Sequence, residues 1–139
     1  MKQFFTCTLL LCSMLTLNGC QKKEAPAEKV KSVDFTIVSE TDIPEELLEI
    51  INERKEVPFQ LTFSDQNFLY VVKGYGSQET GGYDIVVNDF YQNADSLCLD
   101  TELFCPAADE VIDSRISYPY IVLKTELIDL PVEFIDQAW

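Results

Sequence analysis

The stretch FLYVVKGYGSQETGGYDIVV, residues 68–87, joins two runs of strand-forming residues through a segment rich in glycine. Aromatic and β-branched side chains fill both flanks, as is typical of β-strands. Residues 74–83 between them contain four glycines, and glycine tolerates the backbone angles that tight turns need. The stretch therefore predicts two strands joined by a glycine-rich loop.

Nucleotide-binding functions are excluded for this loop by its residue types. Gly76 and Gly81 have the spacing of a phosphate-binding loop, but Gly82 and Tyr83 stand where that loop carries Lys and Ser or Thr. The dinucleotide-binding pattern fails because Glu79 replaces its last glycine, and a strand follows instead of a helix. Two interpretations stay open: a structural turn, or a loop whose tyrosines contact another protein.

Alternation of apolar and polar residues predicts strands on both sides of this stretch. These strands occupy approximately residues 32–38, 59–64, 97–103, 118–124 and 131–135, with a turn at 92–95. Leu47, Ile50 and Ile51 recur at helical spacing ahead of Pro58, which predicts one short helix. Because the connections are short, antiparallel pairing is favoured. We therefore expect an α+β fold, a mainly antiparallel β sheet of about six to seven strands with one short N-terminal helix.

The N-terminus predicts a lipoprotein signal peptide over residues 1–19. A basic start and a short apolar run lead into Leu17-Asn18-Gly19-Cys20, which resembles a bacterial lipobox. The run is shorter than the roughly 20 residues of a transmembrane helix. We expect cleavage between Gly19 and Cys20 and lipidation of Cys20, which would anchor the chain outside the cytoplasm on the bacterial cell membrane. An ordinary secretory signal is the alternative.

Composition divides the remainder into a tether and one domain. Residues 20–32 follow the anchor as a predicted disordered tether, because they lack aromatic residues and are rich in Lys, Glu and Ala. Residues 33–139 predict one small β-rich domain. Residues 34–139 contain 22 acidic and five basic residues, a formal charge of −17. This charge argues against a nucleic-acid partner and permits a basic protein surface.

Catalysis is not expected. The sequence contains no histidine, which excludes catalytic sites that depend on His, and no metal-binding motif is present. We therefore expect neither an enzyme nor a cofactor. Cys98 and Cys105 form a possible disulfide, but one strand over residues 96–104 would hold them roughly 23 Å apart. A disulfide requires Cα atoms within about 7 Å.

Two separated motifs resemble the C-terminal domain of the protease complex subunit PrcB family. Its Gly-x-x-x-Thr-Gly-Gly-Tyr run is matched within residues 76–83, and its Tyr-Pro-Tyr strand by residues 118–120. The similarity extends over about residues 35–134. The resemblance implies a non-catalytic, membrane-anchored lipoprotein that acts as an accessory, stabilising subunit of an exported protease complex.

The resemblance and the composition together predict a partner-binding surface at the glycine-rich loop and the Tyr-Pro-Tyr strand. The candidate residues are Tyr75, Thr80, Gly81, Gly82, Tyr83, Tyr118, Pro119 and Tyr120. Two alternative functions remain open. One is a stand-alone binding lipoprotein of the cell envelope. The other is a module similar to chagasin-type cysteine-protease inhibitors, whose Thr-Gly-Tyr loop is interrupted here by Gly82.

Overall fold

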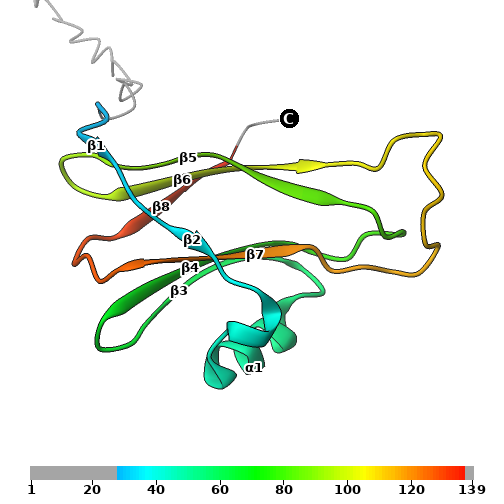
Figure 1. The fold of residues 1–139 in the computed structure, drawn as a ribbon, viewed down its shortest axis with the longest axis horizontal. Helices are drawn as coiled ribbons and strands as arrows, with labels where there is room; N and C mark the ends of the chain where they lie inside the picture. The colour runs from blue at the N-terminus through cyan, green and yellow to red at the C-terminus, as the bar shows by residue number, and fades with distance from the viewer. Residues whose placement is uncertain (1–27, 137–139) are drawn as a thin grey trace, which may run out of the picture.

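The computed structural model describes residues 28–136, which form two four-stranded sheets packed face to face (Figure 1). One sheet has the strand order β1 (Lys31–Ser32), β5 (Asp84–Gln92), β6 (Leu97–Phe104), β8 (Val132–Ile135). The other has the order β2 (Thr36–Ile37), β7 (Tyr120–Glu126), β4 (Phe68–Tyr75), β3 (Pro58–Ser64). A 3-10 helix, η1 (Glu40–Asp42), and one α-helix, α1 (Glu45–Arg54), lie between β2 and β3 in sequence. The predicted class, mainly antiparallel β with one short helix, is confirmed.

Three details differ from the prediction. The strand expected over residues 32–38 is divided into β1 and β2, which join different sheets and raise the strand number to eight. β8 runs parallel to β6, whereas every other paired strand is antiparallel. Third, the last residues of the segment predicted as a disordered tether, residues 20–32, contact strand β5. Lys29 forms an ion pair of 2.8 Å with Asp89, and the Val30 N–H donates to the Gln92 carbonyl at 2.8 Å.

The main core lies between the two sheets. Strand β4 alternates, so that Leu69 and Val71 point into this core while Tyr70 and Val72 point to the opposite face. The buried residues between the sheets are Val33, Leu69, Val71, Phe90, Leu97, Leu99, Ile121 and Leu123. Because Lys73 and Tyr75 continue the Leu69 and Val71 alternation, they also face the space between the sheets.

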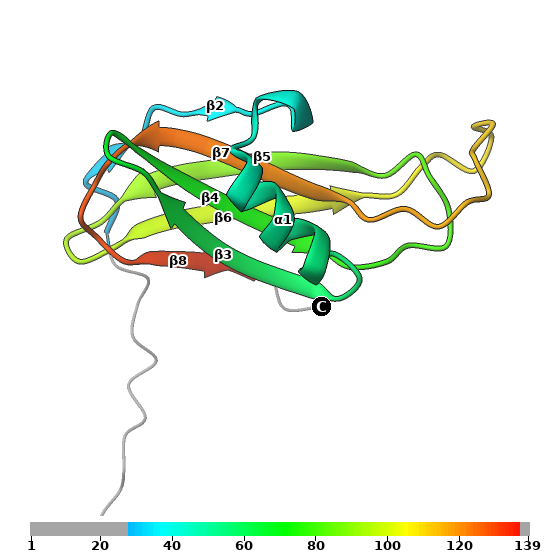
Figure 2. The ribbon, with the colours of Figure 1, turned by 90° about the horizontal axis from the view of Figure 1, so that it is seen from below.

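Helix α1 covers the outer face of the sheet that contains β3, β4 and β7 (Figure 2). Leu47 and Ile51 are fully buried there, in a cluster that also contains Tyr70 and Val122. Burial of each side chain contributes about 1.5–3 kcal/mol relative to exposure. The helical spacing of the sequence is thus explained by packing. Within the part of the chain described here, no helix is long and apolar enough to span a membrane.

The two ends of the sandwich differ. β1 and the β5–β6 hairpin lie at one end, and the glycine-rich loop and residues 105–119 project from the other (Figure 1). In the hairpin turn, the Asn93 side-chain carbonyl accepts hydrogen bonds from the N–H groups of Asp95 (2.9 Å) and Ser96 (2.7 Å). This confirms the turn predicted at residues 92–95 and places it far from the glycine-rich loop.

Candidate functional site

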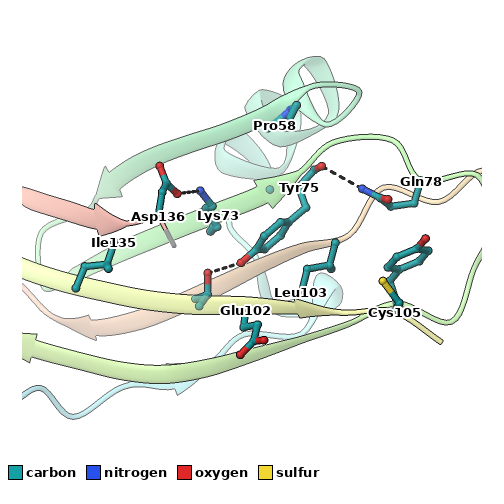
Figure 3. A pocket seen from close by; sticks show the side chains of 12 residues that line it. Pro58, Lys73, Tyr75, Gln78, Glu102, Leu103, Cys105, Ile135 and Asp136 are labelled. Carbon is teal, nitrogen blue, oxygen red and sulfur yellow. Dashed lines mark hydrogen bonds and ion pairs between the residues drawn. The ribbon is translucent and has the colours of Figure 1, made fainter. Parts of the chain in front are cut away.

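A cleft of about 790 Å³ opens between the sheets, at the end where the glycine-rich loop lies (Figure 3). Strands β4 and β6 supply its two walls, and residues at the end of β8 border it. The lining residues are Pro58, Lys73, Gly74, Tyr75, Gln78, Tyr83, Thr101, Glu102, Leu103, Cys105, Ile135 and Asp136. The apolar core is therefore replaced by a partly polar interior toward this end.

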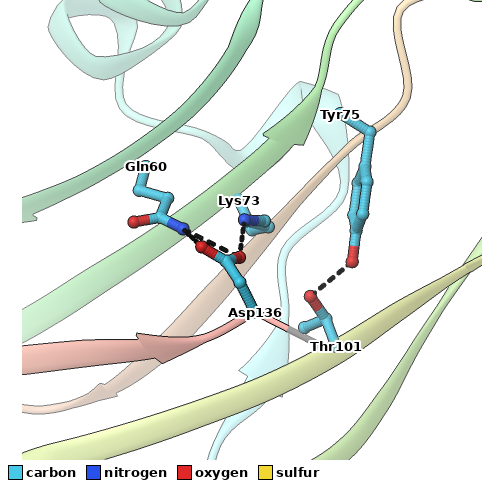
Figure 4. A network of polar contacts seen from close by, with 5 residues as sticks. All are labelled: Gln60, Lys73, Tyr75, Thr101 and Asp136. Carbon is cyan, nitrogen blue, oxygen red and sulfur yellow. Dashed lines mark hydrogen bonds and ion pairs between the residues drawn. The ribbon is translucent and has the colours of Figure 1, made fainter. Parts of the chain in front are cut away.

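Polar side chains connect the walls of the cleft (Figure 4). The Tyr75 hydroxyl shares a hydrogen bond of 2.7 Å with Thr101 Oγ1, across from β4 to β6. Lys73 Nζ donates to a carboxylate oxygen of Asp136 at 2.6 Å, and Gln60 Nε2 lies 3.2 Å from both oxygens of that carboxylate. Lys73 and Tyr75 reach these partners because β4 directs both inward.

Two of the charged residues in the cleft, Lys73 and Asp136, form an ion pair. The hydrogen bond from Lys73 lowers the pKa of Asp136 below its ordinary range. Burial raises the pKa of Tyr75, so this hydroxyl remains protonated and able to donate. Lys73 Nζ also lies 5.5 Å from the centre of the Tyr75 ring. This arrangement provides donors for a bound group, but it offers no nucleophile held by a neighbouring base.

The glycine-rich loop is fixed by hydrogen bonds to residues 113–117. The N–H of Gln78 donates to the Ser117 carbonyl at 2.8 Å, and the Gly81 N–H donates to the Asp113 carbonyl at 2.8 Å. Ser117 Oγ donates to the Thr80 carbonyl at 2.6 Å. Gly82 has a φ of 83°, a conformation that favours glycine. The loop is thus a well-defined turn that holds residues 105–119 in place.

The candidate residues of the loop do not share one environment. Tyr75 is directed into the cleft, and Tyr83 lines the same cleft. Thr80 and Gly81 are half-buried against residues 113–117, and Gly82 is exposed. Of the candidate partner-binding residues in the glycine-rich loop, only some therefore face outward.

The Tyr-Pro-Tyr segment lies directly beside the loop, as expected from the sequence. The Pro119 carbonyl accepts a hydrogen bond of 3.0 Å from the Tyr75 N–H, and Tyr120 lies opposite Gly74. Tyr118 is half-buried, with Lys55 Nζ 5.3 Å from its ring centre. Burial raises the pKa of Tyr120, with a smaller contribution from the charge of Glu40.

Cys98 and Cys105 both have free thiols. Cys98 is buried, whereas Cys105 is exposed and lines the cleft. Strand β6 is continuous from Leu97 to Phe104, so the two lie at opposite ends of one extended strand. Gly19 and Cys20, the predicted cleavage and lipidation positions, lie outside the described residues. Among residues 28–136, no cluster of three or more Cys, Asp or Glu side chains is arranged to hold a metal ion.

The cleft network was missed by the sequence analysis. Lys73 had a detectable signal, because it follows Leu69 and Val71 in the alternation of one strand. Asp136 had none, since its approach to Lys73 depends on how β8 joins β6. Thr101 likewise becomes recognisable only once the two sheets face each other.

The region that carries these features extends from β4 to β7. Residues 69–126 match the family model for the PrcB C-terminal domain. The match confirms the resemblance predicted from the sequence, and it includes both the glycine-rich loop and the Tyr-Pro-Tyr strand. The matched segment also contains Lys73, Tyr75 and Thr101 of the cleft, whereas Asp136 lies beyond it. Comparisons with curated proteins and with solved structures gave no match.

Proposed function

We propose that this chain is a non-catalytic lipoprotein, anchored to the cell membrane outside the cytoplasm, that binds and stabilises an exported protease complex. The observation that carries the proposal is the match of residues 69–126 to the family model for the PrcB C-terminal domain. Two separated motifs of the chain lie within this match. The glycine-rich loop then serves to hold a binding surface rather than to bind nucleotides.

The end of the sandwich formed by residues 105–119 has the properties of a docking surface. Val111, Ile112 and Ile116 are exposed there, although large aliphatic side chains are ordinarily buried. The hydrogen bonds from Gly81 and Ser117 hold this segment before any partner arrives. A surface that is ordered in advance loses less entropy on binding.

The position of this surface fits an anchored protein. The described chain begins at the opposite end of the sandwich, near β1 (Figure 1). A lipid on Cys20 would therefore leave the exposed residues 105–119 directed away from the membrane, where an exported protein can reach them.

Affinity purification of the anchored protein from its own cells, followed by mass spectrometry, tests this function. We expect a stoichiometric exported protease whose lifetime falls when the chain is deleted. A protease that becomes more active on deletion would instead support an inhibitor. Recovery of no protease under mild detergent would contradict the proposal.

Matched variants locate the surface. Val111→Asp together with Ile116→Asp should reduce recovery of the protease. Leu127→Asp is the control, because Leu127 is also an exposed aliphatic residue but lies at the opposite end of β7. If all variants recover equal amounts of protease, residues 105–119 are not the docking surface.

The cleft favours a second candidate, a stand-alone binding lipoprotein. Its volume of about 790 Å³ falls in the range of small-molecule sites, and Lys73, Tyr75 and Gln78 provide donors inside it. Native mass spectrometry of protein purified from its own cells tests this reading. A bound small molecule that is lost in Tyr75→Ala would support it.

A further inference from the structure

Strand β7 is paired along only part of its outer edge. β2 pairs with β7 at Leu123 and Lys124, and a last bond joins the Val38 N–H to the Val122 carbonyl at 2.9 Å. The chain then turns away into η1. Figure 2 shows β2 beside one end of β7, followed by η1, with no strand beside the other end. The stretch from Tyr118 to Ile121, which contains the two residues before β7 and the first two residues of β7, therefore has no strand paired to it on this side.

The alternation of the antiparallel ladder identifies the open backbone groups. The carbonyls of Ser117 and Pro119 accept bonds from Gln78 and Tyr75, so these residues face β4. Tyr118 and Tyr120 alternate with them and must direct their N–H and C=O groups to the opposite side, as Val122 does toward Val38. Among the described residues, no backbone bond is made to these groups.

Pro119 does not block this edge. Proline in an edge strand ordinarily prevents pairing, because it lacks an N–H. Here the position of that missing N–H faces β4, as the bond from the Tyr75 N–H to the Pro119 carbonyl shows. The donors of Tyr118 and Tyr120 on the open side are unaffected.

A groove of about 310 Å³ runs along the same edge. Ile37, Val38 and Ile43 form its apolar wall opposite Tyr120, and Glu40 supplies a negative charge. Lys55 is the nearby cation, placed over the Tyr118 ring. The groove thus offers apolar contacts to side chains that alternate along a strand, together with a carboxylate at one position.

We propose that an extended segment of a partner protein adds to this edge as a further strand of the β7 sheet, with apolar side chains at alternate positions and a basic side chain facing Glu40. Strand addition uses backbone bonds for affinity and alternate side chains for selection. The inference rests on the proposed role of the chain as a protein-binding subunit.

The net charge of the chain indicates which kind of segment binds this edge. Residues 34–139 carry a formal charge of −17, so a second copy of this chain would be repelled and a basic segment attracted. The free groups also favour an extended peptide over a helix, since only a strand supplies donors and acceptors at the ladder spacing.

A short blocked peptide in which valine alternates with lysine and threonine is the probe. Hydrogen exchange followed by NMR should show protection of the Tyr118 and Tyr120 amides when it is added. Two further peptides carry N-methyl groups on one or the other set of alternate amides. One of them should lose binding and the other should retain it, because only one set faces the edge.

Tyr118→Pro and Tyr118→Ala isolate the backbone donor. Both remove the ring, but only proline removes the N–H that points to the open side. We expect Tyr118→Pro to bind the peptide about tenfold more weakly than Tyr118→Ala, as the loss of one hydrogen bond predicts. If Tyr118→Pro does not fold, the proposal is tested by the binding of the two N-methylated peptides to the unmodified protein.

Several outcomes would overturn the inference. These are equal binding of both N-methylated peptides, equal affinity of the two folded variants, or protection confined to other strands. Self-association in sedimentation that Tyr118→Pro abolishes would identify a second copy as the occupant and also overturn it. If a protease is recovered from cells while the peptide fails, only the edge proposal is lost. If the peptide binds and no protease is recovered, only the proposed function is lost.

Discussion

The hydroxyl of Tyr75 on β4 and the hydroxyl of Thr101 on β6 lie 2.7 Å apart and join the two sheets. They do so where the apolar core gives way to the cleft. Thr101 is buried, so this hydrogen bond satisfies a polar group that water does not readily reach. The tyrosine that the sequence indicated for partner binding therefore has a structural role inside the sandwich.

Tyr75→Phe should lower the free energy of unfolding by about 1–2 kcal/mol, because it leaves the Thr101 hydroxyl buried without this partner. Urea denaturation measures the change. Tyr83→Phe is the control, since among residues 28–136 the Tyr83 hydroxyl forms no side-chain hydrogen bond. Thr101→Val combined with Tyr75→Phe should cost less than the sum of the single changes. Additive costs would contradict a bond between them.

The ion pair of Lys73 with Asp136 should make stability depend on acid pH. The pKa of Asp136 is lowered in the folded chain from its ordinary value of 3.8. The pair therefore stabilises the fold above this value, and the contribution is lost as the pH falls through the folded-state pKa. Because the Asp136 side chain is 68% exposed, the contribution should stay below about 1 kcal/mol.

Lys73→Met tests this pair directly. NMR titration of the side-chain carboxyl carbons should show the pKa of Asp136 rising toward 3.8 in the variant. Asp65 is an internal control, because backbone N–H groups of Asn67 and Phe68 lower its pKa. An unchanged Asp136 titration in Lys73→Met would show that the pair does not persist in solution.

Gly82→Ala should destabilise the protein by about 1–3 kcal/mol, because alanine is strained at a φ of 83°. Its Cβ would also lie 3.0 Å from side-chain atoms of Ile112 and Pro106. Gly81→Ala is the matched control, since its nearest neighbour, Asp113 Cβ, would be 3.5 Å away. Thermal unfolding compares the two, and equal melting temperatures would show that Gly82 is not required.

Asn93→Ala should reduce the free energy of unfolding by about 1–3 kcal/mol. The change removes the acceptor for the N–H groups of Asp95 and Ser96 in the β5–β6 turn, and Ser96 is buried. Asp95→Ala in the same turn should change stability by less than about 0.5 kcal/mol, because Asp95 is exposed. Similar losses in both variants would point to the backbone of the turn instead of the Asn93 side chain.

Local patterns predicted the local structure. The spacing of Leu47 and Ile51 gave the helix, and the residues from Gln92 to Asp95 gave the hairpin turn, because each depends on neighbours a few positions away. The division into two sheets depends on pairing between distant segments. The parallel contact of β8 with β6 and the separation of β1 from β2 have no local signal.

The sequence predicted part of the candidate site, as it predicted part of the fold. Proximity of the glycine-rich loop to Tyr118 and Tyr120 agrees with the sequence analysis, whereas the inward direction of Tyr75 was not expected. The pairing of Lys73 with Asp136 joins residues 63 positions apart and required the folded sandwich. Whether the loop end contacts a partner stays a prediction.

The N-terminal segment has a mechanical consequence. β1 and β2 are two residues each and join different sheets, while Val33 between them enters the core and Phe35 packs edge-on to Phe90. Tension applied to the chain ahead of residue 28 would reach these short pairs before any long strand. They would separate one after the other, each residue releasing about 3.3 Å of chain. The segment would thus lengthen under load while the long strands stayed folded, so the N-terminal segment would yield before the rest of the sandwich.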